Sequence, residues 1–156
     1  MRVLAIDPGY ERCGVAVLEK ISGKETILHS DCVRTSATSP FPARLYAVAD
    51  ACRKLLDRYA PEHMALERLY FNSNQKTAMF VAEVRGALIY TAYAHETEIY
   101  EYTPAEIKIA VTGVGNATKK QVMLMVPKLI TTLNPKALDD EYDAIAIGLT
   151  HLAHSR

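Results

Sequence analysis

The sequence predicts a mixed α/β fold in which helices flank a five-stranded sheet. Three strand-like runs within residues 2–35 come first and are separated by short turns, which favours an antiparallel start. Further along, segments with apolar residues at helical spacing alternate with short apolar strands, and helices close the chain. The expected order is βββ-α-β-α-β-α-α-α. A length of 156 residues fits one domain with a full core, so we expect residues 1–156 to form a single domain.

The first half of the chain gives four strands and one helix. Residues 2–7 (RVLAID) are apolar at nearly every position, as in a central strand covered on both faces. Two further strands are expected at 13–20 and 25–35, with a Ser-Gly-Lys turn between them. A helix is indicated by apolar side chains at helical spacing, namely Leu45, Val48, Ala49, Cys52, Leu55, Leu56 and Tyr59. Pro61 ends this helix, and HMALE (63–67) is expected to be the fourth strand.

The segment that follows combines a long helix, a strand and a short helix. Residues 76–94 are apolar on nearly all sides of a helix, so we expect this helix to be buried in the core or at a subunit contact. The fifth strand is expected at 98–103. Pro104 directly after it suits the first turn of a short helix.

Two helices close the chain. Thr118 opens a capping box that should begin the first of them, and Pro127 should kink or shorten it. The last helix is expected at 139–153. We expect Asp139 and Glu141, in its first turn, only to favour the positive end of the helix dipole.

Charge is balanced over the whole chain but is unevenly distributed. The 18 basic and 18 acidic residues argue against a nonspecific polycation. However, the stretch from Lys108 to Lys136 holds five lysines and no acidic residue, and it runs directly into an acidic cluster. A basic surface beside acidic side chains suits a polyanion that is both held and cut. A solvated helix face without a partner is the alternative interpretation of these lysines.

The cysteines and histidines do not predict a zinc site. Cys13, Cys32 and Cys52 are widely spaced and form no CxxC pair, which favours reduced, partly buried thiols in a cytoplasmic protein. His151 and His154 are three residues apart, but they follow the acidic pair of the same helix by about two turns. We therefore expect these histidines at the surface or at the helix end. No apolar run approaches the ~20 residues of a membrane span, so no membrane association is expected.

Four carboxylates dominate the prediction of function. Asp7 and Glu67 each close a short apolar strand, where the chain reaches the edge of a sheet. Asp140 and Asp143 are three apart at the start of the last helix, so both project from the same side. Carboxylates that converge are tolerable around hard cations such as Mg²⁺, and two such ions can activate water and stabilise a phosphodiester transition state. The pattern therefore predicts metal-dependent phosphoryl chemistry.

Four motifs spread over nearly the whole chain carry a specific family resemblance: IDPGYERCGVAV, ALERLYFNSNQKTAMFVAEVRG, YTPAEIKIAVTGVGNATKKQV and DDEYDAIAIGLTH. Together they resemble the RuvC family of bacterial Holliday-junction resolvases, which implies a ribonuclease H-like fold. The family's metal-binding carboxylates match Asp7, Glu67, Asp140 and Asp143. The resemblance implies a homodimer that cuts two opposed strands of a four-way DNA junction. It also implies two Mg²⁺ ions per active site, for which Mn²⁺ is expected to substitute.

The same resemblance suggests residues that contact DNA. Tyr70 matches an aromatic residue that stacks on bases near the crossover, with Phe71 as the fallback, and Asn74 matches an amide in the same loop. Lys108 and Lys119 match lysines near the phosphate backbone, and Lys119 is also expected to contribute to catalysis.

Two further expectations come from the same resemblance. Lys120 is also expected to contact DNA. The pair Arg85-Gly86 matches an Arg-Gly pair of the family and is expected to be structural, on the helix that faces the dimer partner. A branch-migration helicase complex resembling RuvA and RuvB is a further expected partner.

Three alternatives stay open at this point. A related ribonuclease H-like nuclease would act on structured RNA and would be distinguished by the 2′-hydroxyl. A non-catalytic protein would bind branched DNA without needing four carboxylates that face phosphates. A phosphotransferase resembling sugar kinases or actin would normally need two such domains, for which this chain has no room.

Overall fold

The computed structural model describes residues 1–69, 75–131 and 137–155. These residues form five strands and five helices. The elements are, in chain order, β1 (Arg2–Asp7), β2 (Arg12–Ile21), β3 (Lys24–Arg34), α1 (Phe41–Tyr59), β4 (His63–Glu67), α2 (Gln75–Tyr93), β5 (Glu98–Tyr102), α3 (Pro104–Thr112), α4 (Lys119–Leu129) and α5 (Asp139–His154). The predicted order of strands and helices is confirmed.

The five strands form one mixed sheet in the order β3-β2-β1-β4-β5. The first three strands pair antiparallel, as the short turns between them require. By contrast, β1 pairs parallel with β4, and β4 pairs parallel with β5. Because β1, β4 and β5 run the same way, their carboxyl ends lie at one edge of the sheet.

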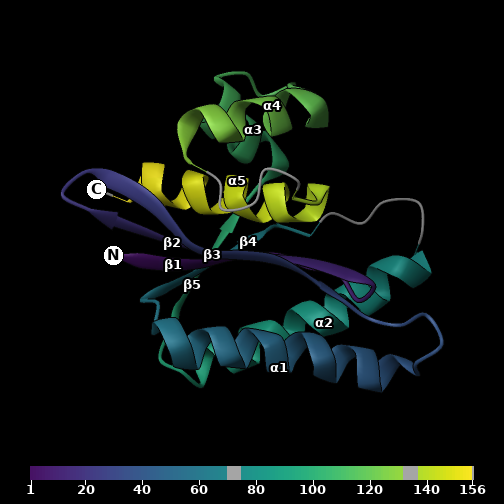
Figure 1. The fold of residues 1–156 in the computed structure, drawn as a ribbon. Coiled ribbons are helices and arrows are strands. Elements are labelled where there is room, and N and C mark those ends of the chain that lie inside the picture. Colours follow the sequence, from purple (N-terminus) through teal and green to yellow (C-terminus); the bar gives the residue numbers. More distant parts are fainter. Residues whose placement is uncertain (70–74, 132–136, 156) are drawn as a thin grey trace.

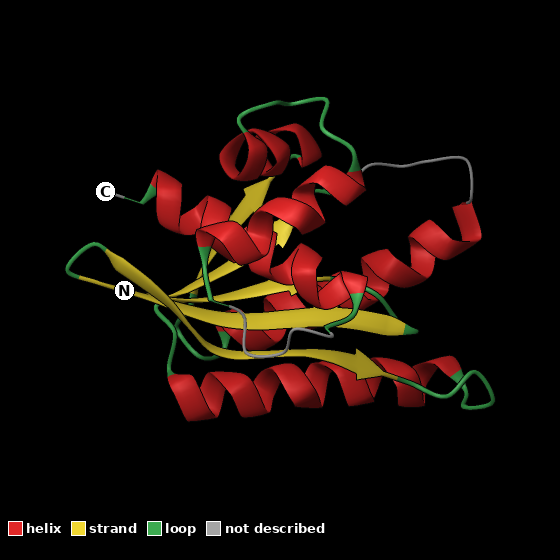
Figure 2. Ribbon diagram, turned by 45° about the horizontal axis from the view of Figure 1, so that its top comes forward, coloured by secondary structure: helices red, strands yellow, loops and turns green. Residues whose placement is uncertain are grey.

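Helices cover both faces of the sheet. Figure 1 shows α1 and α2 on one face, α5 on the other, and α3 with α4 stacked outside α5. The view in Figure 2, turned by 45°, shows the same layers. Each parallel connection passes through a helix on the α1–α2 side, so the strands at the centre of the sheet are covered on both faces.

Alternation along β1 divides the core into two halves. Val3 and Ala5 pack with α5 and its neighbours, whereas Leu4 and Ile6 pack against α1 and α2. All four side chains are fully buried, so the nearly continuous apolar run of β1 is explained by packing on both faces.

Helix α2 is only partly buried. Val84, Leu88 and Ala92 lie in the core, while Met79, Tyr90 and Tyr93 are 62%, 77% and 78% exposed. Within this chain the core buries one side of the helix, and an apolar surface is left facing outward, so burial at a subunit contact stays a prediction. No described helix has both the length and the apolar character that a membrane crossing requires.

Pro127 does not end α4, which continues through it to Leu129. The prediction of surface positions fails for His151, which is fully buried. Its Nδ1 pairs with the Tyr102 hydroxyl at 2.9 Å, and its Nε2 pairs with Nδ1 of His63 at 2.8 Å. A polar side chain is stable at this depth because both ring nitrogens have partners.

Candidate active site

Asp7 and Glu67 lie at the carboxyl ends of neighbouring parallel strands. Ile6 of β1 pairs with Leu66 of β4, so the next residue of each strand reaches the same edge of the sheet. The residues directly before them, 3–6 in β1 and 64–66 in β4, are apolar and fully buried, which fixes the two backbones. The sheet thereby brings together two carboxylates that are 60 residues apart in the sequence.

Gly14 positions the first turn of α5 beside Asp7. Asp7 and Gly14 are paired across β1 and β2. A Cβ atom built on Gly14 would lie 1.9 Å from the carbonyl oxygen of Asp140, so only glycine permits the helix to approach the strand this closely. The first turn of α5 therefore carries Asp140 and Asp143 over the end of the sheet that bears Asp7.

Two cationic side chains neutralise the acids of α5. Lys119 Nζ lies 2.6 Å from Asp143 Oδ2 and 3.2 Å from Asp139 Oδ2. Arg12 forms ion pairs with both Asp139 and Asp140. Asp139 thus does more than favour the helix dipole, because it connects the two cations.

Glu141 points away from this cluster into the protein. Its carboxylate is buried, and Ser30 donates a hydrogen bond to Oε1 at 2.5 Å. The expectation that Glu141 would only favour the helix dipole is wrong, because it also anchors α5 to β3.

The pKa values of three of the carboxylates, those of Asp7, Glu67 and Asp143, are raised. Burial, together with the negative charges of Asp143, Glu67 and Asp140, raises the pKa of Asp7 to about 7. Burial and the charge of Asp143 raise the pKa of Glu67, and burial raises that of Asp143 although Lys119 opposes the effect. A site that holds its acids at raised pKa values favours the binding of additional positive charge.

Two cavities meet at Glu67. One of about 250 Å³ is also lined by Lys108, Lys119 and Asp143. The other, of about 200 Å³, is also lined by Asp7 and the N-terminal part of the loop after β4. Among the described residues, Glu67 therefore lines a cavity on each of two sides, one shared with Asp143 and the other with Asp7.

Arginines hold the end of β4 in place. Arg85 of α2 is buried, forms an ion pair with Glu101 and donates a bond of 3.5 Å to the carbonyl oxygen of Glu67. Arg68 also pairs with Glu101, at 3.8 Å, and not with Glu67. This leaves the Glu67 carboxylate available to a ligand.

The donor set suits Mg²⁺, because carboxylate oxygens are the ligands that this ion prefers. Within the described residues, no three acidic, histidine or cysteine side chains are already arranged around a common point as metal ligands. The ion pairs explain this, since Arg12 holds Asp140 and Lys119 holds Asp143. Metal binding here would require both carboxylates to exchange a side-chain cation for a metal ion.

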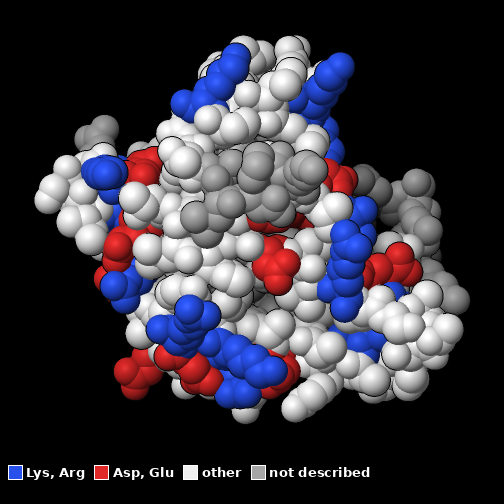
Figure 3. All heavy atoms as spheres, in the orientation of Figure 1, with Lys and Arg blue, Asp and Glu red and all other residues white. Residues whose placement is uncertain are grey.

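The expected DNA-contacting residues fall into two groups. Tyr70, Phe71 and Asn74 lie outside the described residues. Lys108 lines the larger cavity, while Lys119 and Lys120 begin α4. Figure 3 shows basic side chains on the outer surface of the layer formed by α3 and α4.

Arg12 is a residue of the site that was not predicted from the sequence. It lies at the start of β2, the strand that pairs with the one bearing Asp7. Its position five residues after the strand-end acid, across a tight turn, was a usable signal. Its contact with the last helix could not be seen without the fold.

Comparison with known proteins agrees with this arrangement. The family model described as crossover junction endodeoxyribonuclease RuvC matches residues 3–151. Crossover junction endodeoxyribonuclease RuvC of Mycolicibacterium smegmatis is 38% identical over 97% of this chain and 82% of the relative. The protein of the same name from Finegoldia magna is 38% identical over 100% of this chain and 95% of the relative.

Solved structures show the same fold. Thermus thermophilus RuvC in complex with a Holliday junction substrate superposes with a TM-score of 0.91 at 32% identity, covering 100% of this chain and 95% of that one. The structure of Thermus thermophilus RuvC gives a TM-score of 0.88 at 31% identity over 100% and 96% of the two chains. The expected ribonuclease H-like fold is confirmed. The chain belongs to the RuvC family of crossover junction endodeoxyribonucleases.

Proposed function

We propose that this protein is a Mg²⁺-dependent endonuclease that resolves four-way DNA junctions during recombination and repair by nicking two opposed strands symmetrically. The observation that carries the proposal is the gathering of Asp7, Glu67, Asp140 and Asp143 at one edge of the sheet, with cations beside them. The substrate follows from the family and from the Thermus thermophilus relative, which was solved with a Holliday junction. Residues 1–156 act as one nuclease domain in this proposal, in the cytoplasm.

The four carboxylates would hold the metal, with two ions per site. When bound, Mg²⁺ supplies Lewis-acid chemistry, since it activates water for attack on phosphorus and offsets the charge that develops on the phosphate oxygens. The charges of the other three acids all act on Asp7 and raise its pKa, so in this proposal Asp7 would help to hold both ions. Mn²⁺, which also prefers oxygen ligands, should substitute.

Lys119 has two roles in this proposal. In the absence of metal it neutralises Asp143 and Asp139 and so keeps the first turn of α5 in place. With Asp143 holding metal, the ammonium group of Lys119 would be free to bind a phosphate oxygen of the cut strand. Its place in the first turn of α4, where backbone N–H groups are available, strengthens such an interaction.

Lys108 and Lys120 would extend the phosphate contacts on either side of Lys119. Tyr70, with Phe71 as the alternative, would stack on bases near the crossover, and Asn74 would assist from the same loop. Each stacked base typically contributes ~1–3 kcal/mol without demanding a particular sequence. Binding would therefore depend on junction shape and backbone charge, and a branch-migration complex would deliver the junction.

Two symmetric nicks require two active sites, and the outward surface of α2 offers the contact between copies. Met79, Tyr90 and Tyr93 are exposed on this helix. Gly86 lies among them, and a Cβ there would meet nothing within 4 Å, so a second backbone could approach closely. An exposed apolar helix surface of this kind is typical of a homodimer interface.

The test separates binding from cutting on a synthetic four-way junction. Asp143→Asn should retain junction binding within a few-fold and lose paired nicking by at least about 10³-fold, because removing a metal-binding charge acts mainly on the chemical step. Asp57→Asn on α1, an exposed acid distant from the site, is the matched control and should cut normally.

Mapped nicks at symmetric positions by the unaltered protein would confirm the class of enzyme and the substrate. Normal cutting by Asp143→Asn would refute the assignment of the site. Preference for an RNA junction in competition would refute the choice of substrate.

A further inference from the structure

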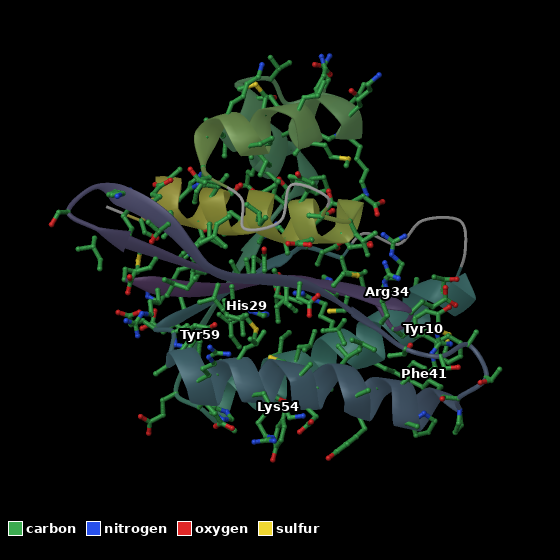
Figure 4. The ribbon with its side chains drawn as sticks, viewed as in Figure 1. Tyr10, His29, Arg34, Phe41, Lys54 and Tyr59 are labelled. Carbon is green, nitrogen blue, oxygen red and sulfur yellow. The ribbon has the colours of Figure 1, made fainter. Side chains whose placement is uncertain are left out.

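Apart from the two cavities at Glu67, a further pocket lies on the β2–β3 side of the molecule, next to the carboxylates. It has a volume of about 330 Å³ and is lined by Glu11, Arg12, Arg34, Thr35, Ala37 and Arg44. Figure 4 shows Arg34, Tyr10 and Phe41 at the same end of the molecule, where β3 ends and α1 begins. Three guanidinium groups line this arginine pocket. Arg12 is paired with Asp139 and Asp140 and Arg44 with Glu11, so among the described residues Arg34 carries the positive charge that has no counter-ion.

Arg44 is built into the wall of the arginine pocket. Its residue is only 8% exposed, its Nε donates to Thr35 Oγ1 at 2.9 Å, and its guanidinium lies 4.8 Å from the centroid of the Tyr10 ring. The buried Nη2 forms an ion pair with Glu11 Oε1 at 3.6 Å but has no hydrogen-bond acceptor among the described residues. A buried donor without an acceptor is costly, so a phosphate oxygen within hydrogen-bond distance would satisfy this nitrogen.

Arg12 and Arg34 face each other across the antiparallel pair of β2 and β3. Like charges in directly opposite positions destabilise a sheet, and Asp139 and Asp140 offset this repulsion on the Arg12 side alone. Arg34 is exposed, and its guanidinium has neither a hydrogen bond nor an ion pair within the part of the chain that the structure describes. Arg12 pairs with Asp139 and Asp140, so the arginine pocket borders the candidate active site directly.

We propose that the arginine pocket binds a backbone phosphate of the junction, flanking the position where the strand is cut. Guanidinium groups bind phosphate oxygens in a planar, bidentate manner, and Nη2 of Arg44, which has no hydrogen-bond acceptor among the described residues, supplies a fixed donor. The occupant is a DNA strand because Arg12 makes the pocket continuous with the carboxylates where DNA is cut. This inference rests on the proposed function and adds a contact on the side of the site opposite to the lysines of α3 and α4.

Arg34→Gln is the decisive variant, since an exposed side chain without a partner can be replaced without disturbing the fold. The slope of log K against log salt concentration for junction binding should become shallower by about 0.9, the value for one phosphate contact. If that contact contributes nothing at 1 M salt, the loss of affinity is about 15-fold at 50 mM salt and about 4-fold at 200 mM salt. Arg34→Lys should keep the slope, because the charge remains.

Lys24→Gln is the matched control, because it removes one exposed charge at the other end of the same strand. Its binding curve should follow that of the unaltered protein. Nicking rates at saturating protein should be normal for Lys24→Gln, because this side chain lies outside the arginine pocket.

Neutral methylphosphonate groups placed singly along the junction strands identify the phosphate. One position flanking the cut should weaken binding by the unaltered protein and have no effect on Arg34→Gln. Binding by Arg34→Gln with the original affinity and salt slope, together with normal nicking, would overturn this inference while the proposed function stands. If the unaltered protein neither binds nor nicks the junction, the proposed function fails, and the inference fails with it.

Discussion

At the scale of one residue, repulsion between carboxylates raises the pKa of Asp7. Burial and the charges of Asp143, Glu67 and Asp140 bring this pKa to about 7. In the unfolded chain its pKa is about 3.8. Between these two values the folded state holds a proton that the unfolded state has released, so the contribution of Asp7 to stability falls as pH rises from about 4 to 7.

Asp7→Asn should therefore stabilise the protein in EDTA at pH 8. A shift of about three pKa units corresponds to at most about 4 kcal/mol, which is the upper limit of the expected gain. Mg²⁺ should stabilise the unaltered protein and have little effect on the variant, which should not cut DNA. Urea unfolding at pH 8 with EDTA and with Mg²⁺ measures both effects. A variant less stable than its parent in EDTA would contradict the claim that charge repulsion at Asp7 destabilises the folded protein.

His151 has the opposite effect on stability. Burial, with the nearby His63 and His154, lowers its pKa to about 4 from 6.5. The unfolded state therefore takes up a proton below pH 6.5 that the folded state cannot accept until pH 4, so stability falls as pH falls through this window.

His151→Gln should remove this pH dependence. We expect the unaltered protein to lose about 2 kcal/mol more than the variant between pH 7 and pH 5. Urea unfolding at the two pH values gives the difference, and His95→Gln, on the α1–α2 side of the sheet, serves as the control. Equal losses in His151→Gln and its parent would show that His151 accepts a proton in the fold.

Some residues of the site were predictable and others were not, for one physical reason. Asp7 and Glu67 follow apolar strands, and a strand fixes where its last side chain lies. The roles of Arg12 and His151 depend on partners from other elements, which are 127 residues away for Arg12 and 49 and 88 residues away for His151. A local pattern holds no information about such contacts.

At the scale of elements, the contact between α5 and the sheet sets the geometry of the site. Gly14 and Gly148 both allow close approach, but to different atoms. A Cβ on Gly14 would meet the backbone oxygen of Asp140 at 1.9 Å, whereas one on Gly148 would meet the end of the Leu18 side chain at 2.4 Å. The succession of strands and helices along the chain was predictable from the sequence pattern, but this register between helix and strand was not.

Gly14→Ala should displace the first turn of α5, because a backbone atom cannot move aside alone. Each glycine replacement should cost about 1–3 kcal/mol of stability. Cleavage should fall at least about tenfold in Gly14→Ala, which moves Asp140, and stay near normal in Gly148→Ala, where the Leu18 side chain can yield. Single-turnover nicking and urea unfolding of both variants provide the comparison. Full cleavage by Gly14→Ala would contradict the proposed role of this contact.

At the scale of the whole molecule, the exposed apolar surface of α2 is the feature that one chain does not explain. Sequence periodicity showed that the helix is apolar on nearly all sides, but only the fold shows which side the core leaves uncovered. Tyr90 and Tyr93 remain more than three-quarters exposed. A second copy of the chain would cover them and place two active sites on one junction.

Tyr90→Glu should therefore produce a folded monomer, since a carboxylate at the centre of an apolar contact is strongly unfavourable. Its sedimentation mass should be about half that of the parent at micromolar concentration. Nicks should then occur singly. Val114→Glu, which alters an exposed apolar residue between α3 and α4, should remain a dimer. A dimeric Tyr90→Glu protein would place the interface elsewhere.

The most direct test of the central claim is the location of metal in a crystal of the protein grown with Mn²⁺ and junction DNA. Anomalous scattering marks each ion independently of the refined protein structure. We expect two peaks within ligand distance of Asp7, Glu67, Asp140 and Asp143, with Lys119 and Arg12 released from Asp143 and Asp140. Peaks bound by other side chains, or no peak in crystals whose DNA is cut, would contradict the account.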